Sequence, residues 1–411
     1  RRSSGAACRL LQKHKIARVV FDDSSGLAMP LEAFVEGIML GQYEFTAFKK
    51  APEPPTTLVN EIVAVTASGE GLEEIREGIE RTIVVCESAN WARNLGNTPP
   101  THMTARILAS EAREMAEKLG LEVVVYDEKW LAENKMEAFL GVARGSAEPP
   151  RLIIIRYTHP DAKATLALVG KGVTFDTGGI SLKPKQGMWD MKFDMCGAAA
   201  VLGATRAIAT LKPTINIICA VPTCDNKTGP DAQVPGDIVR AYNGKTSEIH
   251  STDAEGRMLL ADTLAYITQH YKPDAVVDAA TLTGAAVVAL GHYAAAILGN
   301  NDELEGDLEI ASEATGERIW PLPLWNEYTR LMKGNHADLN NAGPPGEAGT
   351  ITAAAFLKEF VGDTPWAHLD IAGTAWGGKH VPYLNENHAT GFGVRLFTQW
   401  VSDVAQQSTE S

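Results

Sequence analysis

The sequence lacks the signatures of several common enzyme sites. Its 411 residues contain neither an H-E-x-x-H zinc-protease motif nor a G-x-S-x-G nucleophile elbow. The glycines of residues 170–179 fit neither the G-x-x-x-x-G-K-[ST] phosphate loop nor the G-x-G-x-x-G dinucleotide fingerprint. These absences argue against a zincin, a serine hydrolase of the usual type, a P-loop nucleotide hydrolase and a Rossmann oxidoreductase.

Cysteine is scarce, and the five that occur are scattered without a C-x-x-C pair. An odd number of separated cysteines is typical of free thiols in a reducing compartment. The first residues also lack the apolar segment of a secretory signal. We therefore expect a cytoplasmic protein.

Long hydrophobic runs and an excess of positive charge are missing as well. The longest apolar stretch, residues 275–290, is too short to cross a membrane and contains Asp278 and Gly284. The net charge of −14 disfavours nucleic-acid backbones and anionic membranes as partners. A hydrophobic content of 45% is ordinary for a soluble globular enzyme, so we expect neither membrane association nor nucleic-acid binding.

The apolar periodicity predicts an α/β fold of two domains. We place a small N-terminal α/β domain at residues 1–71, a connecting helix at 72–94 and a larger C-terminal domain at 95–411. Residues 129–140 are expected to form one helix. From residue 165 onward strands and helices alternate, which is typical of a mixed, largely parallel sheet covered by helices.

The stretch at residues 251–257 combines acidic residues with the start of a helix. Its Thr-Asp-Ala-Glu run fits a capping box, in which a hydroxyl and a glutamate three residues later satisfy free backbone N–H groups. Asp253 and Glu255 can instead both point at a cation. This stretch alone leaves both interpretations open. They conflict only at Glu255, whose side chain can either accept from a backbone N–H group or bind the cation.

The stretch from Lys171 to Asp194 favours the cation. A short apolar run before it predicts a buried strand, and the following glycines allow the backbone to bend close to a ligand. Asp194 lies among apolar residues, where a carboxylate must be paired or bind a metal. A salt bridge to Lys171 or Lys183 is the alternative. Because carboxylates shared by two ions form hydrolytic sites, the two stretches together predict two divalent metals.

At these residues the sequence resembles the leucyl aminopeptidase family, the cytosol aminopeptidases, which are dizinc exopeptidases. The resemblance rests on Gly-Lys-Gly-x-x-Phe-Asp-x-Gly-Gly-x-x-x-Lys at 170–183, on Thr-Asp-Ala-Glu-Gly-Arg at 252–257 and on further segments at 191–199, 280–285 and 366–373. It covers most of the chain. It implies that residues 95–411 form the catalytic domain and that the N-terminal domain is shortened at its start.

The resemblance assigns metal ligands residue by residue. The tightly held metal would bind Lys171, Asp176, Asp194 and Glu255, and the readily exchanged metal would bind Asp176, Asp253 and Glu255. The implied cofactors are two divalent ions per subunit, Zn²⁺ or Mn²⁺, with Mg²⁺ or Co²⁺ as further occupants of the exchangeable site. The family usually has asparagine at the position of Ser251 and Glu-Asn at 225–226, so the surroundings of the ligands differ here.

The resemblance also assigns catalytic and substrate-binding residues. Lys183 matches a lysine that stabilises the oxyanion, and Arg257 matches an arginine that holds bicarbonate, the implied general base. This division makes chemical sense, because an arginine cannot act as a base but can fix an anion. The backbone of Gly256 and Leu282 would complete the anion site. The residues implied to bind substrate are Met191, Thr281, Leu282, Gly284, Ala372 and Ala375.

The implied activity is removal of leucine or another bulky neutral residue from short peptides with a free N-terminus, through a water that bridges the two metals. The implied assembly is a homohexamer, a dimer of trimers. Two alternatives stay open: a dinuclear metal phosphoesterase and a DNA-binding accessory role. The single arginine in the cluster disfavours the first, and the acidic net charge disfavours the second.

Overall fold

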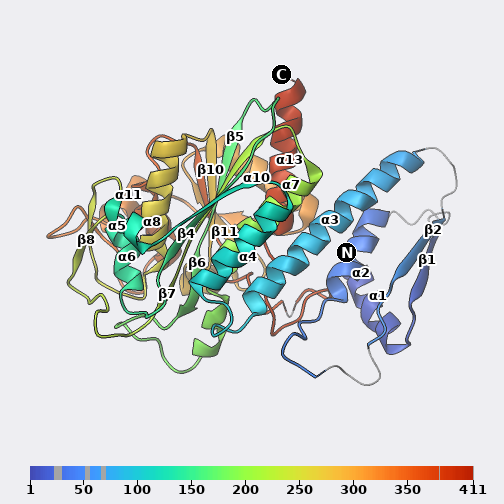
Figure 1. Ribbon diagram of the computed structural model, residues 1–411, viewed down its shortest axis with the longest axis horizontal. Coiled ribbons are helices and arrows are strands. Elements are labelled where there is room, and N and C mark those ends of the chain that lie inside the picture. Colours follow the sequence, from blue (N-terminus) through green and yellow to red (C-terminus); the bar gives the residue numbers. More distant parts are fainter. Residues whose placement is uncertain (23–29, 51–55, 66–70, 379, 411) are drawn as a thin grey trace.

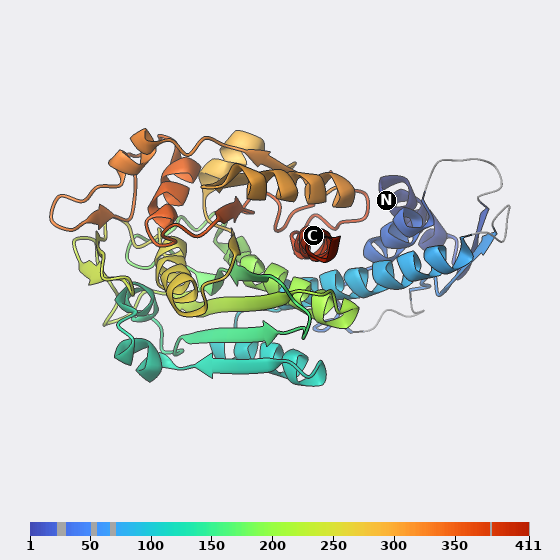
Figure 2. The same cartoon turned by 90° about the horizontal axis from the view of Figure 1, so that it is seen from above.

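The structure is a computed structural model that describes residues 1–22, 30–50, 56–65, 71–378 and 380–410. A small N-terminal unit lies at one end of the molecule, and a larger unit built around a long sheet makes up the rest (Figure 1). Helix α3, Leu72–Asn97, extends from the small unit along the larger one (Figures 1 and 2). The domain limits at residues 71 and 94 stay a prediction.

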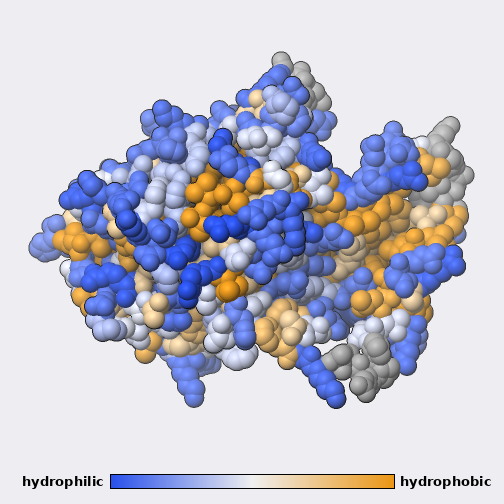
Figure 3. All heavy atoms as spheres, viewed as in Figure 1, coloured by the Kyte–Doolittle hydropathy of each residue, from blue (hydrophilic) through white to orange (hydrophobic). Residues whose placement is uncertain are grey.

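The small unit consists of two helices beside two parallel strands. Its elements are α1 Arg2–Lys13, β1 Arg18–Asp22, α2 Leu31–Gly41 and β2 Glu61–Val65. Phe21, Phe34 and Ile38 are buried in its own small core. Val20 of β1 is 60% exposed, and apolar residues colour the surface of this unit in Figure 3. Sequence reasoning did not predict α1, although the polar and apolar residues of this helix lie on opposite faces.

The larger unit contains a nine-stranded sheet in the order β12-β11-β14-β10-β5-β7-β4-β3, with β6 paired to β7. The strands are β3 Glu122–Tyr126, β4 Arg151–Tyr157, β5 Thr165–Gly170, β6 Gly172–Asp176, β7 Asn216–Asn226, β10 Ala275–Ala280, β11 Ala295–Gly299, β12 Ile319–Pro321 and β14 Trp366–Asp370. The central strands β14, β10, β5 and β7 are parallel, whereas β4 is antiparallel to β7 and β11 to β14. The prediction of a mixed, largely parallel sheet is therefore confirmed.

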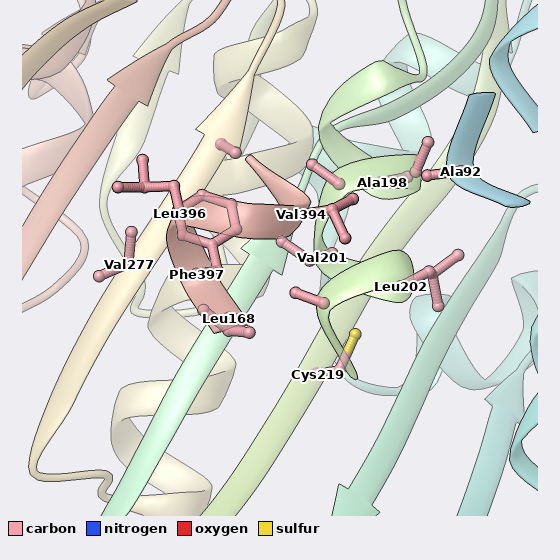
Figure 4. Packing of buried hydrophobic residues seen from close by; sticks show 14 of the residues in the cluster. Ala92, Leu168, Ala198, Val201, Leu202, Cys219, Val277, Val394, Leu396 and Phe397 are labelled. Atoms are coloured by element: carbon pink, nitrogen blue, oxygen red, sulfur yellow. The ribbon is translucent and has the colours of Figure 1, made fainter. Parts of the chain in front are cut away.

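Helices cover both faces of this sheet (Figure 2). The helices of the larger unit after α3 are α4 Ala105–Lys118, α5 Glu128–Glu133, α6 Glu137–Ala143, α7 Cys196–Leu211, α8 Gly256–Tyr266, α9 Gly284–Leu290, α10 Asp302–Thr315, α11 Asn326–Leu331, α12 Gly349–Lys358 and α13 Val394–Glu410. Leu168 and Val277 face α7 and α13 in one core (Figure 4), and their neighbours Val169 and Val276 face the other. Because strand side chains alternate, one apolar strand supplies both cores.

Short elements complete the larger unit. A small sheet combines β8 Ile238–Arg240, β9 Thr246–Glu248 and β13 Leu339–Asn340. A 3₁₀ turn, η2, spans Met188–Phe193, and a π turn, η3, spans Ile267–Tyr271. Among the described residues, no helix combines the length and apolarity that crossing a bilayer requires.

The prediction of a single helix at residues 129–140 is wrong. The structure has two helices there, α5 and α6, with a turn between them. Lys135 adopts a left-handed backbone conformation in this turn, with φ of 57°. A non-glycine residue rarely adopts this conformation, and the apolar spacing of the sequence carries no sign of it.

Candidate metal centre

The candidate site lies where parallel strands of the main sheet end. Lys171 directly follows β5, Asp176 ends β6, Thr281 directly follows β10 and Asp370 ends β14. Because β14, β10 and β5 are neighbouring parallel strands, their carboxyl ends meet at one edge. Ligands bind at this edge in open α/β sheets, so the sheet topology itself brings these residues together.

Lys171 is the most deeply buried cation of the site, with a side chain 2% exposed. Its Nζ lies 2.8 Å from Asp194 Oδ1, 2.7 Å from Glu255 Oε1 and 2.8 Å from the carbonyl oxygen of Thr281. Burial alone would lower the pKa of Lys171, but the Asp194 and Glu255 carboxylates outweigh it and raise that pKa. The salt bridge between Lys171 and Asp194, which the sequence offered as the alternative interpretation, is therefore present in the structure.

Gly256 is required by the position of this lysine. A Cβ at Gly256 would lie 2.6 Å from Lys171 Cε, closer than carbon atoms approach without displacement. Any other residue at the start of α8 would require the Lys171 side chain to move away from its present position.

Lys183 forms the second cationic position and is less buried, with a side chain 21% exposed. Its Nζ lies 2.8 Å from Asp176 Oδ2 and also pairs with Asp253 Oδ1. Asp176 Oδ1 accepts a hydrogen bond of 2.8 Å from the Gly178 N–H, in a turn where Gly178 has φ of 85°. This turn, which glycine permits, returns the chain so that Lys183 faces the carboxylates.

These six residues form what we call the carboxylate cluster: Lys171, Asp176, Lys183, Asp194, Asp253 and Glu255. Its four acids outnumber its two lysines. Carboxylate oxygens of Asp176, Asp253 and Glu255 lie within 4.8 Å of one another. Burial, together with the charge of Glu255, raises the pKa of the Asp176 carboxyl to about 6 although both lysines lower it. Positive charge from elsewhere would relieve this crowding.

The cluster therefore fits divalent metals. Among the described residues, the buried Asp194 Oδ2 has no hydrogen-bond partner, and an unpaired buried carboxylate oxygen is costly. Carboxylate-rich donor sets suit Mg²⁺ and Mn²⁺, and Zn²⁺ also accepts Asp and Glu oxygens. All five residues predicted as metal ligands are brought together in one place.

The capping box predicted as one interpretation of residues 252–255 does not form. Helix α8 begins at Gly256 without a side-chain cap, and Glu255 points to Lys171 instead. The Thr252 hydroxyl donates to the Gly178 carbonyl at 2.6 Å and accepts from the Ser181 N–H at 2.7 Å. Thr252 thus ties the two sequence stretches of the site to each other.

Two asparagines position the carboxylate cluster through hydrogen bonds. Asn226 Nδ2 donates to Asp176 Oδ1 at 2.7 Å and to the Thr252 carbonyl at 3.0 Å. Asn341 Oδ1 accepts from the His250 and Ser251 N–H groups at 2.8 and 3.2 Å, and its Nδ2 donates to the Ser251 carbonyl at 2.7 Å. The sequence left open whether the loop at residues 340–349 lies near the site or is a plain surface loop, and the burial of Asn341 places this residue at the site.

Arg257 lies in the first turn of α8 and is 8% exposed. Within the described part of the chain, its Nε and Nη1 have no hydrogen-bond partner. Burial lowers the pKa of Arg257 to about 10, while the charges of Glu255 and Asp370 oppose that shift. A buried guanidinium with free N–H groups is suited to hold an anion.

Asp370 positions the turn that follows β10. Its Oδ1 accepts from the Leu282 N–H at 3.1 Å and the Ala372 N–H at 3.2 Å, and its Oδ2 accepts from the Thr283 hydroxyl at 2.6 Å. The carboxylate is fully buried, so these bonds satisfy it without water. This contact between two strand ends shapes one wall of the site.

The carboxylate cluster lies at the wall of a cavity of about 390 Å³. The predicted substrate residues Met191, Thr281, Leu282, Gly284 and Ala372 all line this cavity. Ala375 does not, because it is 1% exposed and packs in the core. The cavity wall also contains residues that sequence reasoning missed, among them Met188, Val287 and Trp376.

Comparisons with known proteins agree with this geometry. Residues 90–398 match the cytosol aminopeptidase family, catalytic domain. A probable cytosol aminopeptidase of Geotalea uraniireducens is 44% identical over 405 residues, which cover 98% of this chain and 81% of that protein. Another from Solibacter usitatus is 46% identical over 408 residues, covering 98% of this chain and 83% of that protein. The chain therefore belongs to the cytosol aminopeptidase family, whose members are metal-dependent peptidases that act at the N-terminus.

Proposed function

We propose that the chain is a two-metal aminopeptidase that removes leucine or another bulky neutral residue from the N-terminus of short peptides. The observation that carries this proposal is the meeting of four carboxylates and two lysines at one cavity. The small and apolar side chains of the same cavity support the preference for neutral residues. Membership of the family supports the peptidase chemistry.

The metals would be Zn²⁺ or Mn²⁺, with Mg²⁺ or Co²⁺ as further occupants of the exchangeable site. Lys171, Asp176, Asp194 and Glu255 would hold one ion, and Asp176, Asp253 and Glu255 the other. Two such ions supply Lewis acidity toward the scissile carbonyl and lower the pKa of a water between them. Lys171 can join only as the neutral amine, a form that adjacent dications favour.

The other residues of the site have separate tasks. The Lys183 ammonium reaches the cavity and would stabilise the negative charge that develops on the carbonyl oxygen. Arg257 would hold bicarbonate or a similar anion through its free Nε and Nη1 groups. Met191, Gly284 and Ala372 would contact the first side chain of the substrate.

The expected restriction to free N-termini follows from the readily exchanged metal. The free amine of a substrate would bind that ion beside Asp176 and Asp253, whereas the nitrogen of an acetylated N-terminus is an amide, which is a poor metal ligand. The first experiment compares hydrolysis of leucine amide with that of N-acetyl-leucine amide. The protein is assayed after chelation and again after addition of Mn²⁺, Zn²⁺ or Co²⁺.

We expect metal to restore cleavage of leucine amide alone. Equal cleavage of both compounds would contradict the aminopeptidase proposal. If no metal restores cleavage, generic phosphate esters would test the dinuclear phosphoesterase, and salt-sensitive gel retardation would test an accessory role on DNA. Neither alternative has a specific structural observation in its favour.

The assembly proposed for this enzyme is a homohexamer in the cytoplasm, a dimer of trimers. Light scattering or analytical ultracentrifugation at micromolar concentration would measure its mass. A mass of 44.1 kDa under those conditions would be that of a single chain and would contradict the hexamer.

A further inference from the structure

A second recess of about 560 Å³ adjoins the cavity of the carboxylate cluster. Trp376 lines both, so the recess and the cavity meet at one indole ring. This ring stacks on Phe193, with ring centroids 5.7 Å apart and 16° between the ring planes. Trp376 is thereby held in place as a common wall, and we call this second space the outer recess.

Flat rings dominate the outer recess. Its walls include Trp189, which is 78% exposed, together with His292 and His380. His380 stacks on Tyr293 at 4.5 Å between ring centroids. Contact between water and an indole exposed to this extent is unfavourable, and a ligand that covers the ring would remove that contact. Trp189 therefore offers an aromatic surface to a ligand.

The position of the outer recess restricts what can enter it during peptide cleavage. Trp189 and Met191 lie two residues apart in η2, and Met191 lines the cavity predicted to hold the first side chain. A substrate cleaved after its first residue has no residues before that one. If the proposed function holds, the first side chain lies against Met191, so the end of a long first side chain is the part of the substrate that reaches toward Trp376 and the outer recess.

The Trp189 ring itself favours a neutral occupant over a cation, although the carboxylates of Asp190 and Glu386 also line the recess. Lys192 Nζ already lies 5.2 Å from the centroid of the Trp189 ring, and Asp190 lies beside it in the chain. A second ammonium on the same ring would meet the repulsion of Lys192. A neutral ring meets no such repulsion, and a phenol hydroxyl could donate to Asp190 or Glu386.

We propose that the outer recess is a second side-chain subsite that selects peptides beginning with a large aromatic residue, tyrosine or tryptophan. This proposal rests on the proposed function and names a substrate class for the same site. Leucine ends before Trp376, whereas an aromatic side chain continues along the Trp376 ring and stacks against Trp189. The specificity-determining residue of this subsite is Trp189.

The test measures a ratio of kcat/KM values. Tyrosine amide and tryptophan amide are each compared with leucine amide, using wild-type enzyme and the variants Trp189→Ala and Trp189→Phe. We expect Trp189→Ala to lower both ratios about fivefold, in line with the loss of one aromatic pair. Trp189→Phe keeps a ring and should restore most of each ratio. Trp325→Ala removes another indole, 63% exposed, that lines neither space, and should leave the ratios unchanged.

Three results would overturn the subsite. In the first, Trp189→Ala leaves the kcat/KM ratios of aromatic amides to leucine amide unchanged. In the second, the variant loses cleavage of leucine amide and tyrosine amide equally. In the third, it loses cleavage of arginine amide and keeps cleavage of the aromatic amides. A wild-type enzyme that fails to cleave leucine amide with any metal would instead contradict the proposed function. The two failures are therefore distinguishable in one set of assays.

Discussion

Two buried clusters of charged side chains in the described part of the chain differ in how completely they are paired. The second one, which we call the arginine cluster, joins α2 to the larger unit and consists of Arg1, Glu36, Glu317 and Arg395. Arg395 Nη1 lies 2.5 Å from Glu36 Oε1 and donates to the Thr315 carbonyl, and Glu317 Oε2 accepts from the Gly393 and Leu396 N–H groups.

The arginine cluster is balanced, with two acids and two arginines, and none of its side-chain atoms is a buried group without a partner among the described residues. The carboxylate cluster has twice as many acids as lysines and retains an unpaired oxygen on Asp194. A fully paired network is costly to break at one partner, whereas an excess of buried carboxylates is relieved when a cation binds. Charge balance therefore distinguishes the structural cluster from the functional one.

The largest effect should come from single substitutions in the carboxylate cluster. Asp253→Ala and Lys183→Ala should each lower kcat/KM for leucine amide at least about a hundredfold, because each removes a group aimed at the reacting atoms. Burial raises the pKa of Asp253, which shows that its charge is unfavourable in the metal-free fold. We therefore expect metal-free Asp253→Ala to unfold at no lower urea concentration than the wild type.

Lys118→Ala provides the matched control for these variants, since Lys118 pairs with Glu114 on an exposed helix face. Its activity should equal that of the wild type. An Asp253→Ala enzyme with normal activity would show that this carboxylate takes no part in the reaction.

A substitution in the arginine cluster should lower stability and leave activity unchanged, the opposite of a substitution in the carboxylate cluster. Arg395→Met leaves Glu317 buried without its cation, and breaking such a pair costs about 3–5 kcal/mol. The urea midpoint should fall clearly, while kcat of the folded fraction stays close to that of the wild type. Lys118→Met serves as the control for charge loss at the surface. An unchanged midpoint would mean that this cluster does not stabilise the junction between the two units.

The smallest effect concerns Asp262, a buried acid that belongs to neither cluster. Its carboxylate accepts from the Phe139 N–H at 2.8 Å and the Tyr242 N–H at 2.7 Å, and burial raises its pKa to about 7. The native state therefore keeps a proton that the unfolded chain releases from about pH 4 upward, so wild-type stability falls as the pH rises to 7.

The variant Asp262→Asn carries an amide that does not titrate, so its stability lacks this dependence on pH. It should therefore be destabilised relative to the wild type more at pH 5 than at pH 8. Urea midpoints at the two pH values measure this difference. Equal deficits at both pH values would contradict the raised pKa of Asp262.

Sequence reasoning located the two stretches of the candidate site because their chemistry is local. Lys171, Asp176 and Glu255 stand in short stretches that combine glycines, acids and a strand or helix end, and the alternation of elements places them at one sheet edge. The resemblance then supplied roles for individual residues, which the geometry leaves as proposals.

The parts that sequence reasoning missed or left open depend on contacts between distant segments. Asn341 is buried where its loop contacts the Ser251 backbone, and Trp376, which lines the cavity, stacks on Phe193. The break at Lys135 likewise reflects a backbone conformation that apolar spacing does not encode. Such features follow from tertiary packing, and neither propensity nor periodicity predicts them.

The assembly of the site from separate strand ends also affects when the site can form. Lys171 and Thr281 follow adjacent strands that are distant in the sequence, and Asp370 on β14, which follows both in the chain, holds the turn after Thr281. Contacts between distant segments form late because closing long loops costs entropy. A chain still emerging from the ribosome therefore carries every proposed metal ligand before it carries β14, the strand whose Asp370 shapes the cavity wall.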